Sequence, residues 1–256
     1  MIGGRQPEID RKGGSLHGKG QNEQAAQRHQ RRAGNVARPQ RQVCHVERAE
    51  DGSTLEGRDI YTRASNPNRR ALEEKLAALE GGSEAIAFAS GQAATMSIFH
   101  SLGGNSHVIL PDDIYYNTKV IIDNLYANLG LTCTAVDMTN LGAIKRAIKK
   151  NTKLIWVETP TNPMLNIIDI KAVAAVAKKA GALLGVDNTF ATPYLQKPLD
   201  LGADIVMHSA TKYLGGHSDV IAGALVIKDK ALGDELHFKQ FATGGTLGPM
   251  DSFLVL

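Results

Sequence analysis

From Asp59 to Leu256, short apolar segments alternate with segments of helical periodicity, and no Gly/Ser-rich or Pro-rich linker interrupts this order. Strands alternating with helices are typical of a parallel sheet covered on both faces, so an α/β fold is expected. The expected strands lie at 85–89, 108–110, 132–136, 153–158, 182–187, 205–208 and 222–227.

The first expected helix begins at Asn66-Pro67, because proline is suited to the first helical turn. Leu72, Leu76 and Leu79 follow at helical spacing, and Gly81 can end the helix in a left-handed conformation. Further helices are expected at 92–102, 118–129, 141–150 and 170–180, and from Pro249 onward.

Residues 1–57 have a different character, with no aromatic residue and no helical or strand periodicity. Residues 1–48 hold ten Lys or Arg and four Asp or Glu, a local charge of +6, which leaves the rest of the chain at −3 (19 minus 22). We expect a disordered or aberrant basic extension, and its composition resembles translation in another reading frame. A nucleic-acid-binding tail and an organelle transit peptide are alternatives, but the scattered basic residues and the scarcity of Ser favour neither.

Cys44 and Cys133 stand far apart without Cys-x-x-Cys spacing, which indicates neither a disulfide framework nor a zinc site. His208 and His217 belong to no cluster with metal-ligand spacing, so no metal is assigned. No apolar run is long enough to span a membrane, and the N-terminus lacks the apolar core of a secretory signal. A cytoplasmic protein without a membrane or nucleic-acid partner is expected.

The segment VMHSATKYLGGHSD places Lys212 in a polar stretch directly after the strand expected at 205–208. Ligands of open α/β sheets bind at the carboxyl ends of strands. The neutral amine of a lysine there can attack a carbonyl, and hydroxyl groups of Ser209 and Thr211 can donate hydrogen bonds to a phosphate. An isolated lysine after a strand is more often simply exposed to solvent.

A second segment, LLGVDNTF, ends an apolar strand with Asp187. A carboxylate seldom ends a buried strand without a partner. It can keep a pyridine nitrogen protonated, although capping of the following turn is an alternative role.

Three motifs together resemble the cystathionine synthase and lyase family, the Cys/Met metabolism or transsulfuration enzymes that use pyridoxal 5'-phosphate. They are ETPTNP at 158–163, DNT at 187–189 and SATKYLGGHSD at 209–219, and the resemblance runs from about Asp59 to Leu256. It implies the large domain of the fold type I, aspartate aminotransferase-like enzymes, at 58–248.

The resemblance implies roles for individual residues. Lys212 matches the catalytic lysine that holds the cofactor as a Schiff base, and Asp187 matches the partner of its pyridine nitrogen. Tyr115 matches the tyrosine that stacks on the ring and assists proton transfer. Further cofactor contacts are implied for Ser90, Gly91, Gln92, Glu158, Asn162, Thr189, Ser209 and Thr211.

Tyr61 and Arg63 resemble the family's Tyr-x-Arg pair, which reaches the cofactor phosphate of a neighbouring subunit. Alternation along a strand-like stretch would point both side chains the same way. A homodimer or homotetramer with shared sites is therefore expected.

The sequence also departs from the family pattern. Gln92 replaces a common methionine, Tyr116 and Asn117 replace two common glycines, and Asn68 replaces a frequent threonine. Residues 249–256 are expected to begin a helix leading to a small C-terminal domain, which the sequence lacks and which carries the arginine for the substrate carboxylate.

The function implied is that of a lyase or transferase acting on cystathionine, O-acylhomoserine, cysteine or methionine-like amino acids. It would proceed by β- or γ-elimination or by γ-replacement. The cofactor motifs do not discriminate among these reactions. A truncated remnant that folds, and binds cofactor or dimerises without turnover, is the alternative.

Overall fold

The computed structural model describes Asp59 and residues 61–256 of the chain. The prediction of a disordered or aberrant extension at 1–57 lies outside these residues. Among the described residues, no helix is both long enough and apolar enough to cross a membrane.

Seven strands form one sheet in the order β1-β7-β6-β5-β4-β2-β3. Only β7 runs against its neighbours, so the mostly parallel sheet predicted from the sequence is confirmed. The strands are β1 (Glu84–Phe88), β2 (His107–Pro111), β3 (Thr132–Val136), β4 (Thr152–Glu158), β5 (Leu183–Asp187), β6 (Ile205–His208) and β7 (Gly223–Ile227).

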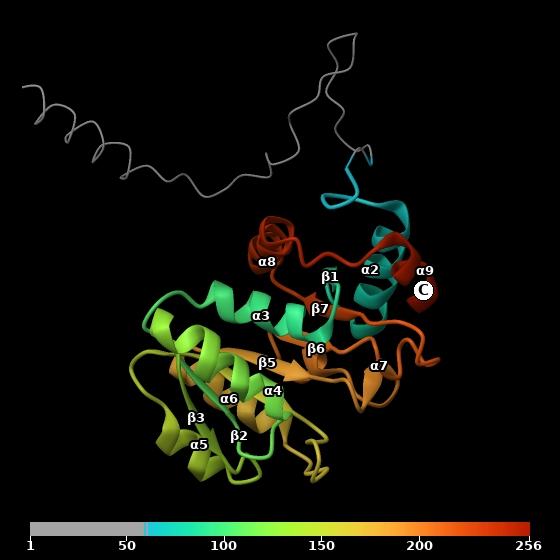
Figure 1. The fold of residues 1–256 in the computed structure, drawn as a ribbon. Helices are drawn as coiled ribbons and strands as arrows, with labels where there is room; N and C mark the ends of the chain where they lie inside the picture. Colours follow the sequence, from blue (N-terminus) through green and yellow to red (C-terminus); the bar gives the residue numbers. More distant parts are fainter. Residues whose placement is uncertain (1–58, 60) are drawn as a thin grey trace, which may run out of the picture. The chain divides into compact units, whose positions relative to one another are not determined.

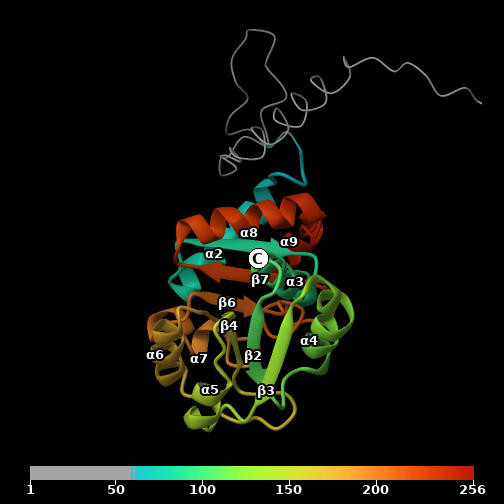
Figure 2. The ribbon, with the colours of Figure 1, turned by 90° about the vertical axis from the view of Figure 1, so that its left-hand side faces the viewer.

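Helices cover both faces of this sheet, with α6 on one side and α3 and α4 on the other (Figure 2). The longer ones are α2 (Pro67–Glu80), α3 (Gly91–Ser101), α4 (Tyr116–Ile121), α5 (Leu141–Ala147), α6 (Ile170–Ala180), α8 (Lys230–Thr243) and α9 (Pro249–Val255). Shorter turns are η1 (Ile122–Tyr126), η2 (Ala127–Leu129), α7 (Thr192–Leu195) and η3 (Pro198–Leu201).

Each face of the sheet has its own apolar core, because successive strand residues point to opposite faces. In β4, Ile155 and Val157 pack with residues of α2, α5 and α6. Leu154 and Trp156 pack instead with residues of α3, α4 and α8. We refer to these as the α2 face and the α3 face.

The expected helix at the start of the described region is confirmed as α2. Asn66 caps its first turn, and Gly81 ends it at a φ of 75°. Two other expectations are wrong in detail. The helix expected at 118–129 is α4 followed by the π-helical turn η1 and the 3-10 turn η2, and the helix expected at 141–150 ends at Ala147.

The sheet positions the site. Strands β1, β2, β4, β5 and β6 point the same way, so the segments that follow them meet at one edge (Figure 1). Strand β7 begins at this edge, because Gly223 pairs with Phe88 at the end of β1.

Candidate active site

A cavity of about 290 Å³ lies at the carboxyl edge of the sheet, on the α3 face. All predicted cofactor-binding residues except Tyr61 and Arg63 line it. They are Ser90, Gly91, Gln92, Tyr115, Glu158, Asn162, Asp187, Thr189, Ser209, Thr211 and Lys212. Residues from five different strand ends therefore converge on one space.

One end of the cavity is formed by the start of α3. The hydroxyl of Ser90 accepts a hydrogen bond from the Ala93 N–H (3.1 Å) and caps the helix. The N–H groups of Gly91 and Gln92 have no acceptor within the helix and are available to a ligand. The helix dipole also favours an anion at this position.

Two hydroxyl groups predicted to bind phosphate lie beside this turn. A Cβ on Gly91 would come within 3.0 Å of Ser209 Cβ, so the two residues are in close contact. Thr211 Oγ1 donates to Ala222 O (3.1 Å) and accepts from Ala222 N (3.0 Å). Because the hydroxyl proton of Thr211 is donated to the Ala222 carbonyl, Thr211 in this conformation holds the backbone in place. The hydroxyl of Ser209 is therefore the better placed donor to a phosphate.

A pair of carboxyl groups forms the floor of the cavity. Glu158 and Asp187 are direct neighbours at the ends of β4 and β5. The N–H and hydroxyl of Thr189 donate to Asp187 Oδ1, at 3.0 and 2.5 Å, so among the described residues Oδ2 is left for an occupant of the cavity.

Burial raises the pKa of Asp187, although the hydrogen bonds from Thr189 partly oppose this shift. Burial also raises the pKa of Glu158 to about 8, and the nearby charge of Asp187 adds to the effect. The Tyr115 N–H donates to Glu158 Oε2 at 2.8 Å. A cation beside Asp187 would relieve this crowding of negative charge.

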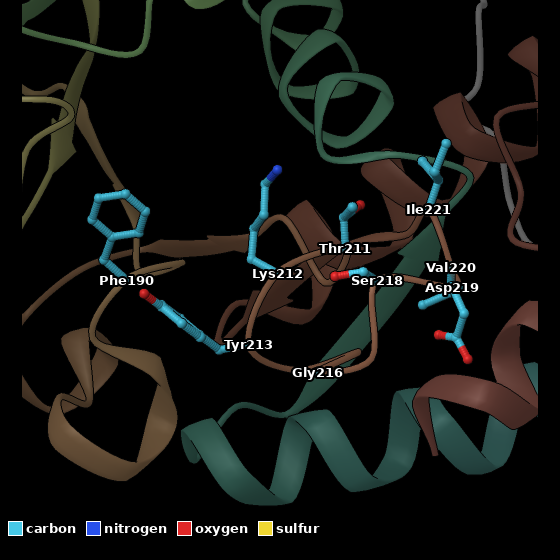
Figure 3. Close-up of a pocket in the computed structure, with 9 residues that line it drawn as sticks. All are labelled: Phe190, Thr211, Lys212, Tyr213, Gly216, Ser218, Asp219, Val220 and Ile221. Atoms are coloured by element: carbon cyan, nitrogen blue, oxygen red, sulfur yellow. The ribbon is translucent and has the colours of Figure 1, made fainter.

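Lys212 lies where this cavity meets a second one of about 720 Å³. Figure 3 shows its side chain rising between Phe190 and Thr211, with the amine pointing away from Gly216. Both cavities share these two neighbours as well as Ile221. The amine is therefore accessible from either side.

Tyr115 is 41% exposed and borders the cavity at the start of α4. Its hydroxyl oxygen accepts a hydrogen bond from Asn117 Nδ2 (3.0 Å). Asn117 is one of the residues that depart from the family pattern, and here it fixes the position of the phenol.

The loop that carries Asn162 is held by Asp113. The hydroxyl of Thr161 and the amide of Asn166 both donate to Asp113 Oδ2, at 2.5 and 2.9 Å. This cluster ties the segment after β4 to the segment after β2, which carries Tyr115. Two walls of the cavity are thus fixed relative to one another.

Tyr61 and Arg63 lie outside the cavity. The expected strand-like stretch is wrong, because the residues form a turn in which Ala64 N donates to Tyr61 O (2.8 Å). The two side chains do meet, with 3.2 Å between Arg63 Nε and the Tyr61 hydroxyl. Arg63 also stacks on Phe241 and donates to its carbonyl (2.8 Å).

Several residues of the cavity wall were not predicted from the sequence. Some have a signal in the sequence: Phe190 follows the DNT motif directly, and Met207 lies two residues before Ser209 on the same strand face. The complete set is Thr95, Thr118, Pro160, Phe190, Met207 and Ile221. No group of three His, Cys, Asp or Glu residues suited to a metal ion occurs in the described part of the chain.

The cavity fits the chemistry of pyridoxal phosphate. The α3 N-terminus and Ser209 suit a phosphate, Asp187 suits a protonated ring nitrogen, and Lys212 suits an aldehyde carbon. Gln92 also lines the cavity, and its buried Nε2 has no hydrogen-bond partner in the structure.

Comparison with known proteins gives an independent result. A sequence profile described as Cys/Met metabolism PLP-dependent enzyme matches residues 21–256. This match begins upstream of Asp59, which is the residue from which the sequence motifs indicated a resemblance to the family.

Individual relatives are similar over most of the chain. Cystathionine gamma-lyase of Bacillus subtilis is 52% identical over 196 residues, which is 77% of this chain and 52% of the relative. Cystathionine gamma-synthase of Mycobacterium tuberculosis is 48% identical over 210 residues, 81% of this chain and 54% of the relative. The chain thus spans about half the length of the curated relatives it matches.

The fold has a counterpart of known structure. Cystathionine gamma-lyase from Lactobacillus plantarum, solved in complex with L-serine, superposes with a TM-score of 0.78 at 46% identity. The superposition covers 82% of this chain and 55% of that protein.

Proposed function

The chain belongs to the family of Cys/Met metabolism PLP-dependent enzymes, and from this premise we propose that it is a lyase or transferase of sulfur amino acids. Its substrates are small amino acids of the cystathionine, O-acylhomoserine, cysteine or methionine type. The proposed reaction is β- or γ-elimination, or γ-replacement.

The observation that carries this proposal is the cavity at the carboxyl edge of the sheet. Lys212, Asp187 and the start of α3 reach it from three separate segments of the chain. A lysine, a buried carboxylate and an anion-binding helix terminus rarely meet in one cavity unless a single ligand uses all three.

The residues that would hold the cofactor follow from this arrangement. We assign the phosphate to Gly91, Gln92 and Ser209, the ring nitrogen to Asp187, and the covalent link to Lys212. Glu158, at the end of β4, and Asn162, in the segment that follows, line the same cavity and would lie beside the ring. When bound, pyridoxal phosphate supplies an electron-withdrawing ring that stabilises negative charge on a substrate carbon.

Two side chains can move protons. The amine of Lys212, once released from the covalent link and neutral, can accept a proton from the α-carbon of an amino acid that enters from the second cavity. The Tyr115 oxygen accepts from Asn117, which leaves its own proton free for donation toward the leaving group.

We further propose a homo-oligomer in which Tyr61 and Arg63 complete the site of a partner subunit. The two residues lie outside the cavity of their own chain, and the guanidinium lies among aromatic rings, a suitable carrier for a phosphate contact. A dimer is the smallest assembly that satisfies this arrangement.

We also propose a cytoplasmic location and a large cofactor-binding domain at 58–248. The two cysteines lack the spacing of a disulfide framework, which supports a reducing compartment. The single sheet and its two cores, which extend from Leu72 to Leu247, support the domain boundaries.

The test is covalent capture of the cofactor. We expect the chain to develop a visible absorbance band with pyridoxal phosphate, and borohydride reduction followed by peptide mapping to locate the label on Lys212. Lys212→Ala should abolish both signals, because Lys212 is the only lysine that lines the cavity in the described part of the chain.

Lys153→Ala is the matched control. Lys153 is also exposed, but it lies near the start of β4, at the opposite edge of the sheet. This variant should bind like the wild type. Absence of the band in folded wild-type protein, or labelling spread over surface lysines, would contradict the proposed function.

A further inference from the structure

A second set of polar residues lies directly behind the floor of the cavity. Glu158, Asp187 and Ser209 face the cavity. Each has a polar neighbour in the sequence: Thr159 follows Glu158, Asn188 follows Asp187, and His208 precedes Ser209. By strand alternation these neighbours point to the α2 face, and all three are buried.

Glu80 connects this second set to α2. It is the last residue of α2 and is completely buried. Its Oε1 lies 2.6 Å from His208 Nε2 and accepts a hydrogen bond from Asn188 Nδ2 at 2.8 Å. One carboxylate therefore joins the ends of β5 and β6.

Gln196 extends the connection to β4. Its amide donates to Asn188 Oδ1 (2.9 Å) and to Thr159 O (3.2 Å), and Asn188 donates to Gln196 O (2.9 Å). We call Glu80, Thr159, Asn188, Gln196 and His208 the α2-face network. It spans the three strand ends that carry the cavity floor.

The α2-face network contributes less to stability than apolar packing would. Glu80 Oε2 and His208 Nδ1 are buried and have no hydrogen-bond partner in the structure. Apolar residues of similar volume would generally be at least as stable as buried polar groups whose hydrogen bonds are incompletely satisfied. A requirement for defined geometry is a better explanation than stability.

The network has a direct route to the cavity. Asn188 N donates to Met207 O (2.9 Å), and Ser209 N donates to Thr189 Oγ1 (2.8 Å), so β5 and β6 are bonded where their cavity residues begin. Thr189 in turn donates to Asp187. Any shift of Asn188 or His208 would therefore move the Asp187 carboxylate and the Ser209 hydroxyl.

We propose that Glu80 is a positioning residue for the cofactor site, which holds Asp187 and Ser209 in register through Asn188 and His208. This inference rests on the proposed function and extends it. The hydrogen-bond partners of Glu80 named above, Asn188 and His208, do not line the cavity, so Glu80 acts on the cofactor site through them. His208 also supports the role electrostatically: burial raises the pKa of Asp187, and His208 acts to lower it.

The first test is the affinity of the full chain for pyridoxal phosphate. Glu80→Ala should raise the Kd about tenfold or more and shift the visible band or its induced circular dichroism, since the hydrogen bonds of one side chain to both Asn188 and His208 are lost. Glu80→Gln keeps an acceptor for Asn188 and should recover most of the affinity.

Leu76→Ala is the matched control for stability. Leu76 is buried one turn earlier on α2 and packs in the apolar core of the same face. This variant should lower the Tm at least as much as Glu80→Ala does, but leave the Kd within about twofold and the spectrum unchanged. Equal effects of the two variants on Kd and spectrum would overturn the proposal.

A second measurement does not depend on cofactor. In the cofactor-free chain, Glu80→Ala should speed amide hydrogen exchange in peptides covering 183–190 and 205–213, whereas Leu76→Ala should not do so selectively. Unchanged exchange in these peptides would overturn the proposal. If wild-type protein captures no pyridoxal phosphate, the proposed function fails, and this exchange comparison alone decides the role of Glu80.

If Glu80→Ala does not fold, Asn188→Ala takes its place in both measurements. It removes the bond from Asn188 Nδ2 to Glu80 and leaves the carboxylate with His208. The same tenfold loss and the same faster exchange are expected, and their absence contradicts the proposal.

Discussion

Gly223 shows how the backbone at a single residue shapes the candidate site. It begins β7 and lies against the turn that enters α3. A Cβ at this position would come within 2.2 Å of Ser90 O and 2.6 Å of Gly91 N. Both are backbone atoms, so no side-chain rotation could relieve the clash.

We therefore predict that Gly223→Ala displaces the start of α3 and weakens binding at its N-terminus. The free energy of unfolding should fall by about 1–3 kcal/mol, as in overpacked cores. Urea unfolding and titration with pyridoxal phosphate measure the two effects.

Gly104→Ala is the control for this prediction, because the nearest atom to a Cβ there is 3.5 Å away. Its stability should remain within about 0.5 kcal/mol of wild type. Equal behaviour of the two variants would show that β7 does not constrain the α3 turn.

At this scale the sequence predicts residues whose chemistry is unusual for their position. Lys212 and Asp187 stand out because a charged group follows an apolar strand. Glu80 has no such signal: a glutamate at the end of a helix resembles any exposed charge, and its burial depends on contacts of its side chain with Asn188 and His208, far away in the sequence. Tertiary contacts of this kind are not encoded in local periodicity.

At the scale of elements, the strands were the most predictable part of the fold. The expected strands at 132–136 and 205–208 coincide with β3 and β6. The helix α8 was not predicted, although Asp229 caps its start and Gly244 its end. Gly233 lies inside it, where glycine is unfavourable, and a Cβ there would come within 2.5 Å of Glu84 Oε2, at the end of a flexible side chain.

The packing of α2 on β1 leads to a prediction about pH. Glu73 on α2 accepts a hydrogen bond from Ala87 N (2.9 Å). Burial raises its pKa to about 7, with a smaller raising effect from Glu84, while Ala87, Arg69 and Arg70 act to lower it. Because the folded-state pKa lies above that of the unfolded chain, the contribution of Glu73 to stability is largest at low pH and is lost as pH rises toward 7.

Glu73→Gln should remove this dependence while keeping an acceptor for Ala87. Between pH 5.5 and pH 8, the stability of the wild type relative to Glu73→Gln should fall by roughly 2 kcal/mol. Denaturant unfolding at both pH values measures this difference. Glu74 is an exposed neighbour on the same helix, so the stability of Glu74→Gln should change with pH as that of the wild type does. If the stability difference between the wild type and Glu73→Gln is the same at both pH values, Glu73 does not cause the pH dependence.

At the scale of the whole molecule, α2 links two regions with different proposed roles. Its last residue, Glu80, joins the strand ends behind the cavity. Near its start, the buried Arg69 donates to Thr62 O (2.7 Å) and Arg63 O (3.3 Å), which fixes the turn carrying Tyr61 and Arg63. If these residues serve a partner subunit, the same helix supports both its own site and that of its partner.

Shared sites predict complementation between two defective chains. Lys212→Ala lacks the amine but keeps Arg63, whereas Arg63→Ala lacks the guanidinium but keeps Lys212. In a mixed dimer, the site that has Lys212 from one chain and Arg63 from the other is intact. Random reassociation of equal amounts should restore wild-type affinity to about a quarter of all sites.

The two variants should have different defects when they are measured separately, so labelling in the mixture can be assigned to mixed dimers. Lys212→Ala should form no covalent product, and Arg63→Ala should bind pyridoxal phosphate about ten- to a hundredfold more weakly, because it loses a charged contact to phosphate. Borohydride labelling at a cofactor concentration well below the Kd of Arg63→Ala reports only intact sites. If labelling in the mixture equals the average of the two separate samples, Arg63 acts within its own chain, and the turn at Tyr61 is held against Phe241 for structural reasons alone.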